Sequence, residues 1–527
     1  MKFSFLDGKN ESGFFSRFKI YNIKHNSIMA TSDKPFPEFL TDFESTLKHL
    51  FHEKEDIDQL SLERGLPPEI MKGIMSKNPL SVAIPKEYGG RGAIVKECLA
   101  LLSAASYESL SLSLTFGINI ALFLEPVAKY AQEEVKKGIF DRFLHQQNMG
   151  GLMITEPNYG SDALNMKTFN RETDNGFEIK GTKHWQGLTG WADFWLIATR
   201  KKLENGELAR DIDFFISDNS VEKQQIVVEE LYDNAGLYLI PYGLNSLDIE
   251  VPKNQKLQPE STGIKMMLDI LHRSRLQFPG MGTGFLKRML DEAIAHCQNR
   301  IVGAGNLLEL DQVQFQLSKM QAAFTLSSAM CFRSSKMSGI EFDLAAQGME
   351  ANSMKAVVTD LMQESAQILV QLSGANGYRT SHIGGRGIMD SRPFQIFEGS
   401  NEMLYSQIAE MLTRQMKKKK QGNFLQYLKT MEVTSEASDY FKKDLNFTID
   451  NTLSQRKLVD LGKIIARIIC AGYVLELQAE GYRKDLSENC IALVRQEIKA
   501  LLSNFHAENS IKVVENYSEN SSWIHFV

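Results

Sequence analysis

The sequence lacks the residue patterns of several classes of protein. Its 527 residues include only five cysteines, and none of them stands in a CxxC or Cys/His spacing; they are Cys98, Cys297, Cys331, Cys470 and Cys490. Neither a disulfide framework nor a metal site is therefore expected. An odd number of scattered cysteines is typical of a reducing compartment, and we predict a cytoplasmic protein that binds no metal.

An excess of positive charge is also missing. Lys and Arg number 59 against 65 Asp and Glu, which gives a formal net charge of −6 and no basic field to attract nucleic acid. We find no apolar run of the roughly 18 residues that a membrane span needs, and no layout of a secretory signal. Nucleic acid as a ligand and a membrane-spanning segment are both excluded at this level.

What is present is the composition of a globular protein, with 43% hydrophobic and 24% charged residues. The length exceeds one ordinary core, so several domains are expected. The opening stretch up to Met29 mixes phenylalanine with basic residues. It is interpreted either as a targeting peptide or as sequence before a true start at Met29.

The hydrophobic pattern changes period along the chain. Residues 30–150 have helical spacing, residues 151–263 alternate as strands do, and residues 264–416 return to helical spacing. The order predicts a mainly α protein with an inserted β domain. Residues 423–527 predict an additional helical module.

Four consecutive lysines, residues 417–420, stand before this module. They are interpreted as a solvated linker, with contact to an anionic membrane surface as the alternative.

Three segments carry the predicted chemistry. Residues 154–162 read ITEPNYGSD, and residues 181–187 read GTKHWQG. A third, split segment reads QLSGANGY at 371–378 and FQIFEGSNE at 394–402. In this order they resemble the acyl-CoA dehydrogenase family, over about residues 35–414. The resemblance implies an acyl-CoA substrate, FAD as cofactor, a β-barrel-like middle domain and a C-terminal four-helix bundle.

Several flavin contacts are implied by the resemblance. They are Ile154, Thr155 and Ser161 under the ring, and Trp185 against it. A flavin needs fixed donors near its N1/O2 edge, because negative charge collects there as the hydride arrives. Gly187 stands where the family commonly places a hydroxyl that bonds the hydride-accepting nitrogen.

Glu398 matches the family's base, which removes the α-proton of the thioester. An α-proton is too weakly acidic for a solvated carboxylate, so the base must lie in an apolar pocket that raises its proton affinity. Ile396, Phe397 and Met403 are the expected apolar neighbours. Some relatives carry the base at the position of Ser274, which cannot act as a carboxylate base.

The remaining site residues are also implied by the resemblance. Ser400 and Glu402 would contact the flavin end, and Arg300, Gln371, Gly374 and Ala375 the adenosine half, bound mainly by a neighbouring subunit. The protein is therefore expected to be a homodimer or homotetramer. The substrate contacts would be Ser161, Arg275 and Gly399.

The predicted function is dehydrogenation of an acyl-CoA to the trans-2-enoyl-CoA, with electrons passed from FAD to a carrier such as electron-transfer flavoprotein. Two alternatives remain open. Gly187 favours a flavin oxidase or monooxygenase on the same fold. Gly303 and Ala304, which follow Arg300, differ from the residues usual in the family. This difference favours a non-catalytic assembly protein.

Overall fold

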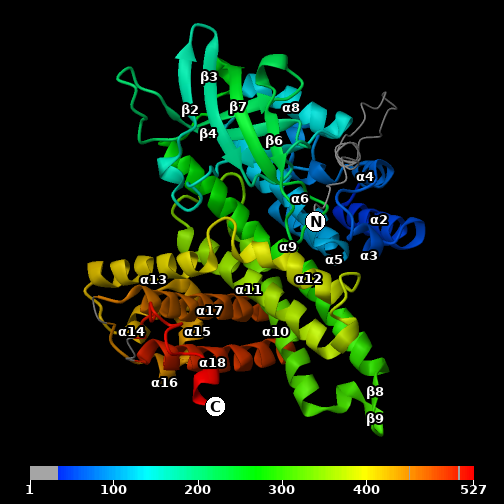
Figure 1. The fold of residues 1–527 in the computed structure, drawn as a ribbon, viewed down its shortest axis with the longest axis vertical. Coiled ribbons are helices and arrows are strands. Elements are labelled where there is room, and N and C mark those ends of the chain that lie inside the picture. The colour runs from blue at the N-terminus through cyan, green and yellow to red at the C-terminus, as the bar shows by residue number, and fades with distance from the viewer. Residues whose placement is uncertain (1–33, 450–451, 508–510) are drawn as a thin grey trace.

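The computed structural model describes residues 34–449, 452–507 and 511–527 (Figure 1). The opening stretch up to Met29, interpreted above as a targeting peptide or as sequence before the start, lies outside the described residues. The predicted class, mainly α with an inserted β domain, is confirmed.

The described part of the chain begins with a layer of helices. The first of them, α2, buries Phe39, Phe43 and Leu47, which stand four residues apart on one face. The elements of this layer are α2 (Phe36–Lys48), η2 (His49–Lys54), α3 (Ile57–Leu60), α4 (Pro68–Met75), η3 (Pro79–Ala83), η4 (Lys86–Tyr88), α5 (Val95–Glu108), α6 (Leu110–Asn119), η5 (Ile120–Leu124), α7 (Glu125–Tyr130) and α8 (Glu133–Gln146).

The expectation that no apolar run reaches the length of a membrane span was wrong. The continuous helix Leu110–Tyr130, made of α6, η5 and α7, is long and apolar enough by length and composition. Almost all of it is buried inside the protein, which is the placement of a core helix.

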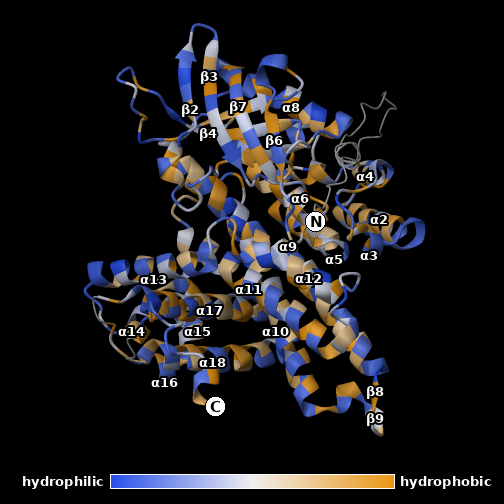
Figure 2. Ribbon diagram, viewed as in Figure 1, coloured by the Kyte–Doolittle hydropathy of each residue, from blue (hydrophilic) through white to orange (hydrophobic). Residues whose placement is uncertain are grey.

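The middle of the chain forms a curled seven-stranded sheet in the order β1-β4-β2-β3-β7-β6, with β5 paired to β4. β2 is mostly hydrophilic and its outer half is exposed (Figure 2). Two strand ends matter for function, because β1 ends directly before Ile154 and β3 ends directly before Trp185. The elements are β1 (Gly150–Met153), η6 (Ala163–Asn165), β2 (Phe169–Thr173), β3 (Gly176–His184), β4 (Phe194–Lys201), β5 (Asp213–Asp218), η7 (Glu222–Gln224), β6 (Val227–Leu231), β7 (Gly243–Pro252) and η8 (Lys253–Gln255).

A bundle of long helices follows, centred on α9. This helix crosses closely over α5 at Gly284, where an added Cβ would stand 1.9 Å from Ser103 O, so only glycine allows the approach. The elements are α9 (Gly263–Asn299), β8 (Ile301–Val302), β9 (Gly305–Asn306), η9 (Leu307–Glu309), α10 (Asp311–Met337), α11 (Gly348–Ser373), η10 (Gly374–Asn376), α12 (Ile383–Ser391), η11 (Arg392–Gln395) and α13 (Asn401–Lys418).

The last part of the chain is helical, as expected, and α17 and α18 pack on α13 and α10 (Figure 1). The interpretation of residues 417–420 as a linker was partly wrong, since Lys417 and Lys418 belong to the last turn of α13. Lysines favour that position because they complement the negative end of the helix dipole. The elements are α14 (Phe424–Leu428), α15 (Glu432–Tyr440), α16 (Lys442–Leu445), α17 (Gln455–Ala479), α18 (Lys484–His506) and η12 (Trp523–Phe526).

Candidate active site

Glu398 lies in a short loop, residues 396–400, between η11 and α13; we call it the catalytic loop. The backbone is left-handed at Glu398, with φ of +54°, and at Gly399, with φ of +92°. For glutamate this costs about 1–2 kcal/mol. A side chain at 399 would also stand 2.8 Å from Met403 Cε. The loop therefore holds one acidic residue in a strained, fixed position.

The carboxyl group of Glu398 has two different oxygens. Oε1 accepts a hydrogen bond of 2.6 Å from Ser274 Oγ on α9, whereas Oε2 is buried and has no partner among the described residues. Burial raises the pKa of Glu398, and the hydrogen bond from Ser274 and the charges of Arg275 and Lys355 oppose this effect. One oxygen is thus anchored and the other is available as a base.

Aromatic rings pack beside the catalytic loop. The Phe397 ring lies 5.0 Å from that of Phe394 and 6.0 Å from that of Phe278, measured between centroids. Met403 is partly buried against the core. Ile396, at the start of the catalytic loop, has 56% of its surface exposed.

Arg275 holds the backbone of the catalytic loop. Its Nε donates to Glu398 O at 3.1 Å, and its Nη1 donates to Asn352 Oδ1 on α11 at 2.7 Å. The side chain is buried. The structure therefore brings the predicted residues Arg275, Glu398 and Gly399 together.

Lys355 on α11 completes this group, although no motif in the sequence pointed to it. It is fully buried, and its Nζ donates to Gly399 O at 2.8 Å and to Asn401 Oδ1 at 3.0 Å. Burial lowers the pKa of Lys355 to about 7, although the Glu398 carboxylate favours its charged form. The lysine therefore titrates close to neutral pH, within electrostatic reach of Glu398.

The loop after β1 is fixed by a buried ion pair. Lys183 Nζ lies 2.9 Å from Glu156 Oε1 and donates to Ile154 O at 2.8 Å. Thr155 O accepts hydrogen bonds of 3.0 Å from His184 N and Gln186 Nε2. Breaking a buried pair costs about 3–5 kcal/mol. The predicted flavin contacts Ile154 and Thr155 therefore have a rigid backbone, whereas Ser161 lies farther along the loop and is exposed.

Trp185 follows β3 with a left-handed backbone, φ +60°, and 52% of its surface is exposed. Its ring lies 4.6 Å from that of Tyr232 and 6.2 Å from that of Tyr242, measured between centroids. At Gly187 an added Cβ would stand 2.6 Å from Ile118 Cδ1 and 3.5 Å from the Tyr242 ring. A side chain at 187 would therefore require the end of the Ile118 side chain to move.

Asp390 on α12 joins the β domain to the bundle. Its Oδ1 accepts a hydrogen bond of 2.6 Å from Leu237 N, in the connection between β6 and β7. Burial raises the pKa of Asp390 to about 6. The backbone of Met389, the residue before it, lies close to Gly236, where an added Cβ would stand 2.6 Å from Met389 O.

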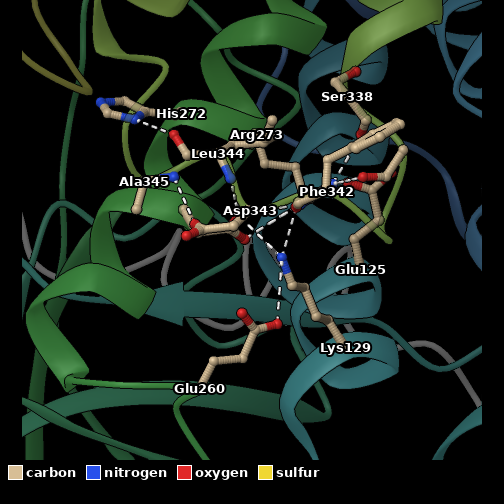
Figure 3. Close-up of polar contacts among 12 residues, drawn as sticks. Glu125, Lys129, Glu260, His272, Arg273, Ser338, Phe342, Asp343, Leu344 and Ala345 are labelled. Atoms are coloured by element: carbon tan, nitrogen blue, oxygen red, sulfur yellow. Dashed lines mark hydrogen bonds and ion pairs between the residues drawn. The ribbon is translucent and has the colours of Figure 1, made fainter.

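A second network of charges lies on the other side of α9 (Figure 3). Arg273 projects nearly opposite to Arg275, because successive helical residues turn by about 100°. Asp269 Oδ1 lies 3.2 Å from Lys129 Nζ and accepts from Leu344 N at 2.7 Å. Arg273 Nη1 donates to Ser338 O at 2.8 Å. This network ties the connection between α10 and α11 to α9.

The predicted adenosine contacts lie away from Glu398. α9 and α11 run side by side in the same direction, since Arg275 bonds Asn352 and Gly282 faces Val358. Arg300 follows the last residue of α9, about 37 Å along the helix from Arg275. It is exposed, as are Gln371, Gly374 and Ala375 at the end of α11.

Ser400 and Glu402 lie at the opposite end from Arg300, beside Glu398. They line a cavity of ≈ 680 Å³ together with Arg456 on α17. One copy of the chain therefore places the two sets of predicted cofactor residues at opposite ends of α9 and α11.

Comparison with known proteins identifies the architecture. The N-terminal, middle and C-terminal domains of the acyl-CoA dehydrogenase family match residues 45–147, 151–247 and 261–413. The mitochondrial short-chain specific acyl-CoA dehydrogenase of Homo sapiens is 24% identical over 360 residues, covering 68% of this chain and 85% of that protein.

Two solved structures share the fold. The acyl-CoA dehydrogenase of Bacillus anthracis, complexed with FAD, superposes with a TM-score of 0.72 at 17% identity, covering 93% of this chain and 91% of that one. A prolyl acyl carrier protein oxidase superposes with a TM-score of 0.64 at 17% identity, covering 71% of this chain and 98% of that one. With the three domain matches in order over most of its length, the chain belongs to the acyl-CoA dehydrogenase family.

Proposed function

We propose that the chain catalyses α,β-dehydrogenation of an acyl-CoA thioester to the trans-2-enoyl-CoA. The observation that carries the proposal is the carboxyl group of Glu398, with Oε1 anchored by Ser274 and Oε2 buried without a partner among the described residues. Burial raises the pKa of this group, which increases its affinity for a proton. Removal of an α-proton needs such a base.

The site residues fit FAD as the cofactor. Trp185 offers a half-exposed aromatic face, and the backbone of Ile154 and Thr155 is held in place by Lys183 and Gln186. FAD, when bound, supplies the acceptor for the hydride that leaves the β-carbon.

The chain's own residues supply the proton transfer. Glu398 Oε2 takes the α-proton, and the Glu398 backbone N–H is the donor for the thioester carbonyl, where charge develops. Arg275 and Lys355 fix the backbone that carries both groups.

The proposal extends to partners. Because Arg300, Gln371, Gly374 and Ala375 lie far from Glu398 in one copy, the adenosine half of FAD is assigned to a neighbouring copy in a homodimer or homotetramer. Electron-transfer flavoprotein is the proposed acceptor of the electrons.

A flavin oxidase is the second candidate. Gly187 supplies no hydroxyl to the hydride-accepting flavin nitrogen, and an added Cβ there would stand 2.6 Å from Ile118 Cδ1. The reduced cofactor would then react with oxygen rather than with a protein carrier.

The deciding experiment is an anaerobic titration of the FAD-loaded protein with acyl-CoA thioesters of increasing chain length. We expect one length class to bleach the visible flavin absorbance, with the enoyl-CoA as product. An oxidised flavin after every thioester would contradict the dehydrogenase. Admitting air to the reduced protein then separates the candidates, since rapid formation of stoichiometric peroxide would identify an oxidase.

Replacing Ser274 by Ala tests the anchored oxygen. The hydrogen bond from Ser274 stabilises the ionised carboxylate, so its loss raises the pKa of Glu398 further. The acid limb of the pH–rate profile for flavin reduction should move to higher pH. The rate below the limb should fall about tenfold, as expected for a hydrogen bond to a charged group.

Ser334→Ala is the matched control for this measurement. Ser334 is also buried and donates to α9, but to Leu276 O at 2.6 Å rather than to Glu398. A profile that moves equally in both variants would contradict the role of Ser274.

A further inference from the structure

The C-terminal helical module touches the bundle one turn beyond the catalytic loop. At Gly462 on α17 an added Cβ would stand 1.9 Å from Tyr405 O on α13. The two backbones are therefore in direct contact, which only glycine permits. Figure 1 shows α17 running beside α13.

A tyrosine hydroxyl lies at this contact. Tyr405 is buried, and its hydroxyl donates to Asp360 Oδ2 on α11 at 2.7 Å. Arg467 on α17 donates from Nη1 to the same hydroxyl at 3.4 Å and pairs through Nε with Glu497 on α18 at 2.8 Å. The module thus reaches Asp360 through one intervening side chain.

Asp360 holds both ends of the catalytic loop. Its Oδ1 accepts hydrogen bonds of 2.7 Å from Gln395 Nε2, three residues before Glu398, and from Asn401 Nδ2, three residues after it. Asn401 in turn accepts from Lys355 at 3.0 Å. One carboxylate oxygen of Asp360 therefore binds the residues that flank the loop, and the other accepts from Tyr405. These bonds fix the orientation of the Asp360 carboxylate.

We propose that Tyr405 and Arg467 are positioning residues for Glu398, and that the C-terminal module orients the catalytic loop through Asp360. The inference rests on the proposed role of Glu398 as the base. A base must be held within hydrogen-bond reach of the proton it removes, and displacement of about 1 Å reduces the rate strongly.

The chain offers a matched control for ordinary packing. Tyr473 on α17 is as buried as Tyr405, and its hydroxyl also donates at 2.7 Å to a carboxylate of α11, that of Glu350. Glu350 pairs with Arg333 on α10. Both tyrosines therefore join the module to α11, and only the partner of Tyr405 continues to the catalytic loop.

The first measurement compares Tyr405→Phe with Tyr473→Phe in the FAD-loaded protein. We expect Tyr405→Phe to lower the rate of flavin reduction at saturating acyl-CoA by about 3- to 10-fold, the equivalent of one hydrogen bond. The half-saturating substrate concentration should stay within about twofold. Tyr473→Phe should keep both values, with a similar change in melting temperature. Equal losses of rate in the two variants would overturn the proposal.

The second measurement brings in the module itself. Arg467→Met keeps the aliphatic stem and should reproduce the loss seen with Tyr405→Phe, and the double variant should be no slower than the slower single variant. Additive losses would show two independent contacts and would contradict a shared path through Tyr405.

A third readout does not depend on the reaction. Amide hydrogen exchange of peptides covering residues 394–404 should be faster in Tyr405→Phe and Arg467→Met than in Tyr473→Phe. Unchanged exchange in all three variants would overturn the positioning role, whatever the substrate. If the wild-type flavin is reduced by no acyl-CoA while the exchange differs as expected, the proposed function fails and the positioning contact stands.

Discussion

Replacing Glu398 by Gln is expected to abolish reduction of the flavin by acyl-CoA, with a loss of about 1,000-fold or more in the rate. The amide has the size of the acid and is neutral, so the shape of the catalytic loop should be kept. What is lost is the proton acceptor at Oε2, the buried atom without a partner among the described residues. The measurement is the anaerobic single-turnover rate of bleaching with the best thioester.

Glu125→Gln is the control for this variant. Glu125 is also fully buried, and burial raises its pKa to about 7. Its carboxylate accepts from Gln277 at 2.8 Å, away from the catalytic loop. We expect Glu125→Gln to keep the rate within about threefold. Activity retained by Glu398→Gln would remove Glu398 as the base and with it the proposed reaction.

Replacing Lys355 by Met should have the next largest effect, through structure and charge together. Gly399 O and Asn401 Oδ1 each lose a donor, which should lower the rate about 30-fold at every pH. The positive charge also lowers the pKa of Glu398. Its removal raises that pKa, so the acid limb of the pH–rate profile should move to higher pH.

The charge effect has a built-in upper limit. Because the pKa of Lys355 is about 7, the wild-type lysine is itself neutral at higher pH. Above that pH the wild-type and variant profiles should differ only by the constant factor. The measurement is the rate of flavin reduction between about pH 6 and about pH 9.

Lys129→Met provides the comparison for Lys355→Met. The side chain of Lys129 is also only 7% exposed and is paired with Asp269 at 3.2 Å, but Lys129 is not among the charges that act on Glu398. The Lys129→Met variant should be less stable than the wild type, but the acid limb of its pH–rate profile should not move. A limb that stays in place in Lys355→Met would contradict the electrostatic role of Lys355.

Much of the fold could be predicted from the sequence, because the hydrophobic pattern of each segment indicates its secondary structure. Alternation across residues 151–263 predicted the β domain, and the structure has β1 at Gly150–Met153 and β7 ending at Pro252. Glu398 was predicted to be the base because it stands before Gly399 in a motif. The backbone conformation explains why glycine stands at 399, since both residues adopt positive φ.

The contacts that set the properties of Glu398, the proposed base, could not be predicted from the sequence. Lys355 lies more than forty residues before its partners Gly399 and Asn401, so no spacing rule links them. Only its isolation among the apolar residues of α11 was a signal. Ser274 was considered as a position that lacks a carboxylate, and its role as a donor to Glu398 depends on how α9 packs.

The wrong expectations also have physical reasons. The apolar residues of Leu110–Tyr130 looked interrupted by polar ones, but serine and asparagine bond within the helix or to its neighbours and are buried with it. Lys417 and Lys418 extend α13 because lysine is a good helix former.

At position 398, with its left-handed backbone, the residue that is best for stability is not the one that the proposed reaction needs. Glycine would adopt φ of +54° without strain and would bury no carboxylate. At this position a search for more thermostable sequences therefore favours a residue without the carboxylate of the proposed base. Glutamate at 398 lowers the free energy of unfolding relative to glycine. A screen that scores only stability therefore selects against the proposed chemistry.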